Sequence, residues 1–209
     1  MSYALNEVEA TAKRAARGAG YDWGLAEEAA KATRWLCAQG LDGAAVLAGL
    51  LEAGYAAELS AHVPNSLDGD WLAEAPLCPL ATGAALSDCA ARLQQAPQKL
   101  GPVARPVLIL PFAAMAARQL GACVTVEGEG FQAVTDGIAL GFEGVLPDAP
   151  AVLTIRAGEQ LPVAEPSHTR AEPEEAAWAV LNRFAHKTYA PATEESRLLG
   201  AGAGLSDND

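Results

Sequence analysis

The sequence predicts an α+β protein in which an N-terminal α-helical lobe of three helices packs with a small, mostly antiparallel sheet of four or five strands. Apolar residues recur at helical spacing through residues 5–59, whereas alternation replaces that spacing after residue 123. Thr135-Asp136-Gly137 separates two alternating runs, which is a strong hairpin signal. A C-terminal helix and a Gly-rich tail complete the expected fold.

Length and composition bound the class of protein. The 209 residues suffice for a single domain with its own core. The alanine-rich chain carries a net charge of −12, which argues against nucleic acid and anionic membranes as partners. We find no signal-peptide pattern and no apolar run that could span a bilayer. The four scattered cysteines are typical of reduced thiols, so we expect an acidic cytoplasmic protein.

Within this domain the expected parts follow one another along the chain. Residues 1–60 form the helical lobe, residues 61–105 an irregular connector with a short helix, residues 106–165 the sheet, and residues 170–209 the C-terminal helix and tail.

Residues 5–40 predict a helical hairpin with its corner at residues 18–24. Gly18 and Gly20 are expected to end the first helix, because glycine enters left-handed conformations without a side-chain clash. Asp22 is a good N-cap for the second helix.

This corner is the first candidate site. A glycine-rich turn that leads into a helix can offer free backbone N–H groups to an anion, and Arg14 and Arg17 lie on the preceding helix. Alternatively, Tyr21 and Trp23 are core residues and the glycines only form the turn. No dinucleotide or phosphate-loop fingerprint is present.

A third helix is expected over residues 44–59. It is apolar almost all round, which indicates burial or contact with a second subunit, and hence allows a homo-oligomer. Prolines and glycines break the pattern from residue 62 to 106, where Ser87 is the expected cap of a short helix.

The sheet is expected to begin with a buried strand at residues 107–110, a continuous apolar run. A short helix over residues 113–120 should follow. Further strands are expected at residues 123–127, 131–134, 138–142 and 153–156, with the helices on one face.

The last helix is expected to open at Pro173 and to bury a stripe around Leu181. Thr193 can cap a short helix in the tail, which Gly200 would end before a glycine-rich strip. This tail, residues 193–209, is the second candidate site; the alternative expectation is a frayed, disordered terminus without a function.

The remaining carboxylates and histidines give weaker indications of a catalytic or metal-binding site. Glu127, Glu129 and Asp136 are clustered carboxylates of the sheet, and such groups can do acid–base work or hold a divalent cation. Because Glu127 and Glu129 lie near a turn, solvated turn charges are the favoured interpretation. The three histidines lack metal-ligand spacing, so no metal site is predicted, although a catalytic role for His168 alone is open. The cofactor is unknown.

The two ends of the chain carry a resemblance. The stretches at residues 5–10 and 18–29, and the ending at residues 189–197 with the glycine strip 200–204, resemble a family of uncharacterised bacterial proteins catalogued as a domain of unknown function. The resemblance covers nearly the whole chain. It implies a bacterial setting and assigns no catalytic residue.

Two functional hypotheses follow. The favoured one is a non-catalytic binding or assembly protein that holds a small anionic ligand or a partner between the corner and the tail. Its candidate ligand-binding residues are Arg14, Arg17, Tyr21, Trp23, Glu27, Glu28, Glu194, Glu195 and Arg197. The alternative is a small carboxylate-dependent enzyme acting on a small metabolite, with or without a divalent metal. It would use Glu27, Glu28, Glu194 and Glu195, with His168 as a weaker candidate.

Overall fold

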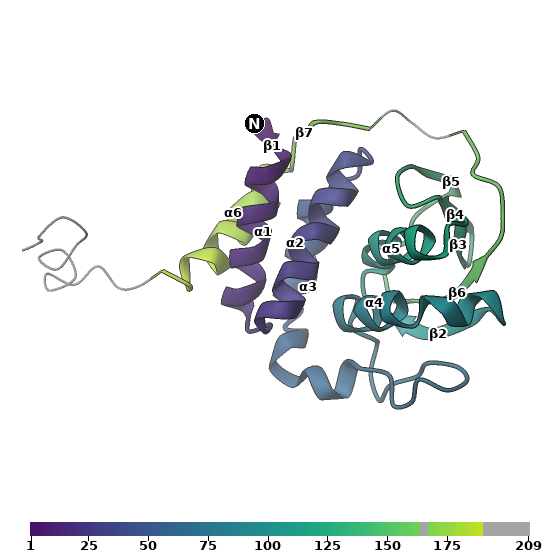
Figure 1. The fold of residues 1–209 in the computed structure, drawn as a ribbon. Coiled ribbons are helices and arrows are strands. Elements are labelled where there is room, and N and C mark those ends of the chain that lie inside the picture. The colour runs from purple at the N-terminus through teal and green to yellow at the C-terminus, as the bar shows by residue number, and fades with distance from the viewer. Residues whose placement is uncertain (164–166, 190–209) are drawn as a thin grey trace, which may run out of the picture.

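A computed structural model describes residues 1–163 and 167–189 and confirms the α+β class (Figure 1). Four α-helices form the helical lobe: α1 (Leu5–Ala19), α2 (Trp23–Ala38), α3 (Gly43–Glu52) and the C-terminal α6 (Glu175–His186). The sheet and its two covering helices, α4 (Pro79–Asp88) and α5 (Leu110–Leu120), form the other lobe. Buried apolar residues from both lobes make one continuous core.

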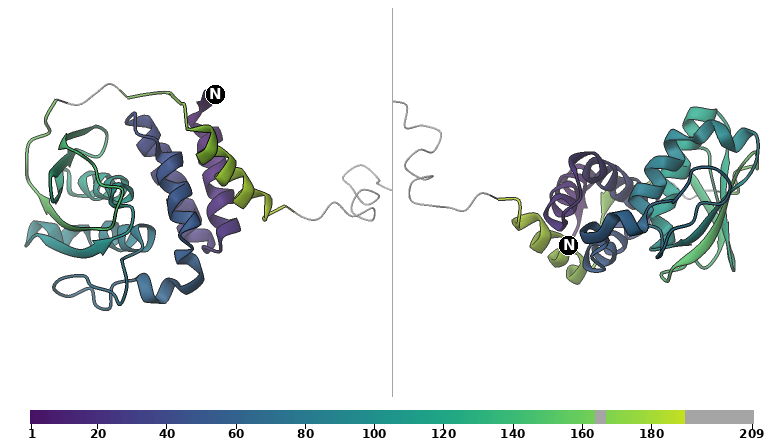
Figure 2. Two further views of the ribbon diagram at one scale, coloured as in Figure 1. Left: turned by 180° about the vertical axis from the view of Figure 1, so that it is seen from behind. Right: turned by 90° about the horizontal axis from the view of Figure 1, so that it is seen from below.

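In the helical lobe, the N-terminal segment lies beside the segment that leads into α6. Strand β1 (Tyr3–Ala4) pairs antiparallel with β7 (Arg170–Ala171); β1 continues directly into α1, whereas residues 172–174 separate β7 from α6. Helices α1 and α6 run side by side in the same direction, as Figures 1 and 2 show. Their C-terminal ends meet beside the corner between α1 and α2.

The sheet has five strands in the order β2-β6-β3-β4-β5, and every neighbouring pair is antiparallel. In chain order the strands are β2 (Gln98–Val103), β3 (Val124–Gly128), β4 (Phe131–Thr135), β5 (Leu140–Gly144) and β6 (Ala151–Ala157). Helix α5 covers one face of the sheet, and α4 packs against α5.

The predicted Asp-Gly hairpin is confirmed between β4 and β5. The Asp136 carboxylate accepts hydrogen bonds from the backbone N–H groups of Ile138 and Ala139, both at 2.8 Å. These two bonds hold the pKa of Asp136 below its usual range, because they stabilise the ionised form.

The opposite face of the sheet carries a polar network centred on Glu159. Its carboxylate accepts hydrogen bonds from Thr125 and Gln132 and pairs with Arg156, which also reaches Glu127 at 3.5 Å. Glu127 thus forms an ion pair with Arg156 on the surface of the sheet.

The prediction of a strand at residues 107–110 is wrong. These residues form the 3-10 helix η3 (Pro106–Ile109), which continues into α5. Their run is fully apolar because the segment is buried on every side, and burial alone does not distinguish a strand from a buried helical turn.

The third helix is shorter than predicted. Helix α3 ends at Glu52, and Gly54, with φ +77°, turns the chain into the separate 3-10 helix η1 (Tyr55–His62). In the part of the chain that the structure describes, no single helix is long and apolar enough to cross a membrane. Helices α3 and η1 meet that threshold only when counted together across a bend of 85°.

The expected irregular connector contains more regular structure than predicted. It holds α4, the 3-10 helix η2 (Ala90–Gln94) and all of β2. Ser87 lies in the last turn of α4 and is not a helix cap. The connector also supplies Trp71, which is fully buried and donates its indole N–H to the carbonyl of Leu67.

Candidate functional site

A pocket of about 450 Å³ lies where the C-terminal ends of α1 and α6 meet the first turn of α2. Its lining comes from three parts of the chain: Lys13, Arg14, Arg17 and Gly18 of α1, Trp23 of α2, and Lys187 and Thr188 after α6. We call this the cation pocket, because four of its seven lining residues are lysine or arginine.

Gly18 allows α6 to approach closely enough to close the pocket. A Cβ atom at this position would lie 1.9 Å from the carbonyl oxygen of Phe184 in α6, far inside van der Waals contact. The prediction that Gly18 ends the first helix is therefore wrong: α1 continues to Ala19, and Gly20 terminates it with φ +110°. Gly18 is a packing residue on the face toward α6.

The four cations differ in how they are held. Lys13 pairs with Glu27 at 2.7 Å, and the Arg17 guanidinium donates to the carbonyl of Tyr21. The guanidinium of Arg14 stands 5.9 Å from the ring centroid of Tyr189, and the Lys187 ammonium 4.6 Å from that of Phe184. Among the described residues, no carboxylate lies within ion-pair distance of Arg14 or Lys187.

Two helix ends offset part of this charge. The C-terminal ends of α1 and α6 each carry roughly half a negative charge from unsatisfied carbonyls, and Arg17 and Lys187 suit such positions. Once Lys13 is paired with Glu27, three full positive charges remain, and they outweigh these partial charges. In a chain of net charge −12 with 14 basic residues, the pocket is a local positive site.

The side chains of the two aromatic residues of the corner lie in different environments. Trp23 lies at the pocket and is 63% exposed, whereas Tyr21 is 1% exposed and belongs to the core. The Tyr21 hydroxyl lies 3.5 Å from the Cys78 sulfur, and burial raises the pKa of Tyr21 well above its usual value. The structure thus places Trp23, and not Tyr21, where a ligand could touch it.

Burial of Tyr21 predicts a loss of stability at alkaline pH. Because its folded-state pKa lies above the usual value of 10.0, its contribution is complete below about pH 10 and declines as the pH rises further. We expect Tyr21→Phe to lose less stability than the wild type between about pH 10 and 11, by up to about 1 kcal/mol. Urea unfolding at both pH values measures this; an equal decline in both proteins would contradict it.

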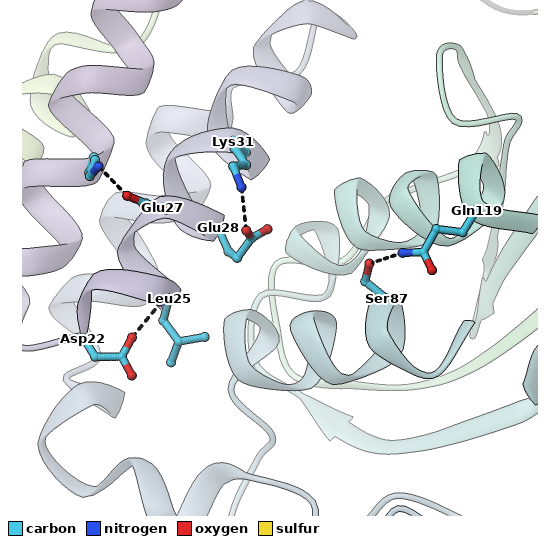
Figure 3. A network of polar contacts seen from close by, with 8 residues as sticks. Asp22, Leu25, Glu27, Glu28, Lys31, Ser87 and Gln119 are labelled. Atoms are coloured by element: carbon cyan, nitrogen blue, oxygen red, sulfur yellow. Dashed lines mark hydrogen bonds and ion pairs between the residues drawn. The ribbon is translucent and has the colours of Figure 1, made fainter. Parts of the chain in front are cut away.

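Glu27 and Glu28 are engaged with lysines of the helical lobe (Figure 3). Glu27 pairs with Lys13, which lowers the pKa of Glu27, and Glu28 pairs with Lys31 at 2.7 Å. Figure 3 shows Glu28 and Lys31 on the side of α2 that faces α4 and α5, where Ser87 accepts a hydrogen bond from Gln119. A second pocket of about 450 Å³ lies here, lined by Asp22, Glu27, Glu28 and Asp88 among others.

The grouping that a bound metal would need is not found in residues 1–163 and 167–189. No three His, Cys, Asp or Glu side chains lie close enough together there to hold an ion. Glu27 and Glu28 are instead seen in ion pairs with Lys13 and Lys31.

His168 lines a different pocket, of about 440 Å³, together with Cys37, Asp42 and Arg170. Here Asp42 caps α3 through the N–H of Ala45 and also accepts the N–H of Glu174 just before α6. Arg170 donates to Ser2, and burial raises the pKa of the Cys37 thiol, which favours its protonated form. These contacts hold the segment that leads into α6 against the helical lobe.

The remaining predicted site residues, Glu194, Glu195 and Arg197, and the glycine strip lie outside the described residues. Lys13 and Lys187 are the two pocket cations that sequence reasoning missed. The one signal for Lys187 was its place near the C-terminal end of a predicted helix, and such a position explains a lysine without any site.

Comparison with known proteins adds a family but no activity. A family model described as "Protein of unknown function (DUF3726)" matches residues 3–96. This part of the chain is similar to that family. No curated protein matches the chain.

The family match confirms the predicted resemblance to a domain of unknown function over residues 3–96, which include α1, α2 and α3. Three of the four cations of the pocket, with Trp23, lie within the matched region, while Lys187 lies beyond it. The bacterial setting and the likeness of the C-terminal ending stay predictions.

Proposed function

We propose that this protein is a non-catalytic binding protein that holds a small anionic ligand in the cation pocket. The observation that carries the proposal is the convergence of Lys13, Arg14, Arg17 and Lys187 on one cavity whose lining contains no carboxylate. Such a concentration of positive charge is unfavourable in the free protein unless an anion or solvent ions offset it.

The geometry suits a ligand with at least two negative charges. Arg14 and Lys187 approach the pocket from different helices, and neither lies within ion-pair distance of a carboxylate among the described residues. Arginine and lysine form strong, charge-assisted hydrogen bonds with phosphate and carboxylate oxygens. The cavity of about 450 Å³ is also within the size range of small-molecule sites.

The carboxylate-dependent enzyme receives less support. Glu27 and Glu28 are each paired with a lysine, and His168 lines a separate pocket from both. This arrangement favours binding over acid–base chemistry, which needs a carboxyl or imidazole free to exchange a proton with a substrate.

Two further expectations remain part of the proposal. The four cysteines are all free thiols, which supports a reducing, cytoplasmic setting. A homo-oligomer is retained as a proposal, although α3 buries most of its apolar residues within its own chain.

Inorganic pyrophosphate is a suitable probe of the pocket. We expect it to raise the melting temperature of the wild type and expect Arg14→Ala to weaken its binding about tenfold, since one charge-assisted bond contributes about 1.5 kcal/mol or more. Affinity should also fall as the salt concentration rises, because the partners are solvent-exposed charges. Isothermal titration calorimetry at two salt concentrations measures both effects.

Lys99→Ala provides the matched control. It removes one positive charge from an exposed position on β2, in the other lobe, and should leave pyrophosphate binding unchanged. Equal losses in Arg14→Ala and Lys99→Ala would show that binding depends on overall charge and would contradict a defined pocket.

A further inference from the structure

We infer that the ligand of the cation pocket is an aromatic anion, in which a planar ring is joined to a group with two or more negative charges. This inference rests on the proposed function and narrows the class of ligand. It is carried by Trp23, which lies in the pocket lining with most of its side chain in solvent.

Trp23 differs from the other tryptophans of the chain. Trp71 is fully buried, and Trp35 and Trp178 pack against the core, while Trp23 is 63% exposed. A large apolar ring in solvent contributes little to folding, because the hydrophobic effect acts on area removed from water. At the edge of a charged pocket, such a ring has surface available for a ligand.

The backbone and a neighbouring cation position this ring. Trp23 is the first residue of α2, directly after Asp22, whose carboxylate accepts the N–H of Leu25 and caps the helix. The Arg17 guanidinium lies 4.6 Å from the centroid of the Trp23 ring and is itself held by its bond to the Tyr21 carbonyl. Arg17 therefore covers part of the ring, and the exposed remainder is open.

Stacking and charge recognition can act on one molecule at this site. Lys13 also lies near the ring, with its ammonium 5.6 Å from the centroid. A planar ring stacked on the open part of Trp23 would bring its charged substituent among cations that already surround the indole. Nucleoside phosphates and aromatic polycarboxylates share this chemistry, and base–aromatic stacking adds affinity whatever the base.

A competing explanation gives Trp23 a purely structural role, in which its ring shields Arg17 at the helix corner. In that case the ring of a ligand would add no affinity, and replacing Trp23 would not distinguish an aromatic anion from a plain one. The two explanations therefore differ in a measurable selectivity.

The test compares ADP, inorganic pyrophosphate and adenosine as probes of the full-length protein by isothermal titration calorimetry. We expect ADP to bind about tenfold more tightly than pyrophosphate, because stacking is added to the same charge contacts. Adenosine alone should bind weakly. In Trp23→Leu the advantage of ADP over pyrophosphate should disappear, so the ratio of the two affinities is the quantity that tests the inference.

Trp23→Phe supplies the matched variant, since it keeps an aromatic face and should restore most of the ADP preference. Because Trp23 is exposed, both variants should melt at the wild-type temperature, which verifies folding. If pyrophosphate binds but ADP is not preferred, or if Trp23→Leu keeps the preference, the aromatic inference is overturned and anion binding stands. If neither ADP nor pyrophosphate binds the wild type, both the inference and the proposed function fail.

Discussion

Gly18→Ala is expected to destabilise the protein and to open the cation pocket. The added methyl carbon would lie 1.9 Å from the Phe184 carbonyl oxygen, so α1 and α6 must move apart. A backbone atom cannot rotate away as a side chain can, and overpacking of this kind typically costs about 1–3 kcal/mol. Separation of the two helices also moves Lys187 away from Arg14 and Arg17, so pyrophosphate affinity should fall together with stability.

Gly24→Ala is the control for this substitution. At Gly24 an added Cβ would meet only the Asp22 side chain, at an ordinary contact distance of 3.6 Å, and the residue lies in the first turn of α2. Alanine there should be neutral or stabilising by up to about 1 kcal/mol, because it favours the helix. Urea unfolding compares the two variants; wild-type stability in Gly18→Ala would refute the close α1–α6 contact.

Trp71→Ala is expected to produce the largest loss of stability, about 3–5 kcal/mol. Trp71 is fully buried, and its indole N–H donates to the Leu67 carbonyl. Its backbone also pairs with the open edge of β2, where its N–H donates to Lys99 and its carbonyl accepts from Gly101. Truncation leaves a cavity at the junction of the connector and the sheet.

The matched substitution is Trp23→Ala, which removes the same atoms from an exposed site. It should change the free energy of unfolding by less than about 0.5 kcal/mol, because little area is buried there. Chemical denaturation of both variants measures the contrast. Similar losses at the two positions would mean that Trp71 does not have the buried environment described above.

Local patterns sufficed to predict much of the fold. The hairpin of α1 and α2, the sheet from β3 to β6 and the C-terminal helix follow from periodicity, from the Asp22 cap and from the Asp136 turn. These signals act within a few residues, so the sequence displays them directly. The strand predicted at residues 107–110 was wrong because an apolar run indicates burial but does not specify whether the backbone is helical or extended.

The candidate site was predicted only in part. Arg14, Arg17 and Trp23 were identified from a glycine-rich corner, and they do line one pocket. The proposed reason for that corner was a turn that binds anions through backbone N–H groups, whereas the pocket presents side-chain cations. Tyr21 was grouped with them because it is adjacent in sequence, although its side chain enters the core beside Cys78.

By itself, the sequence determined the class of this protein, the helical hairpin, the β4–β5 turn and the overall acidic charge, because each depends on composition or on residues near one another in the chain. Only the tertiary structure decided that Lys187 joins Arg14 and Arg17, that Gly18 is a contact residue, and that Trp71 fills the core. Those features depend on α6 lying beside α1 and on the connector folding onto β2. Contacts across such long sequence separations arise from packing, which residue spacing does not encode locally.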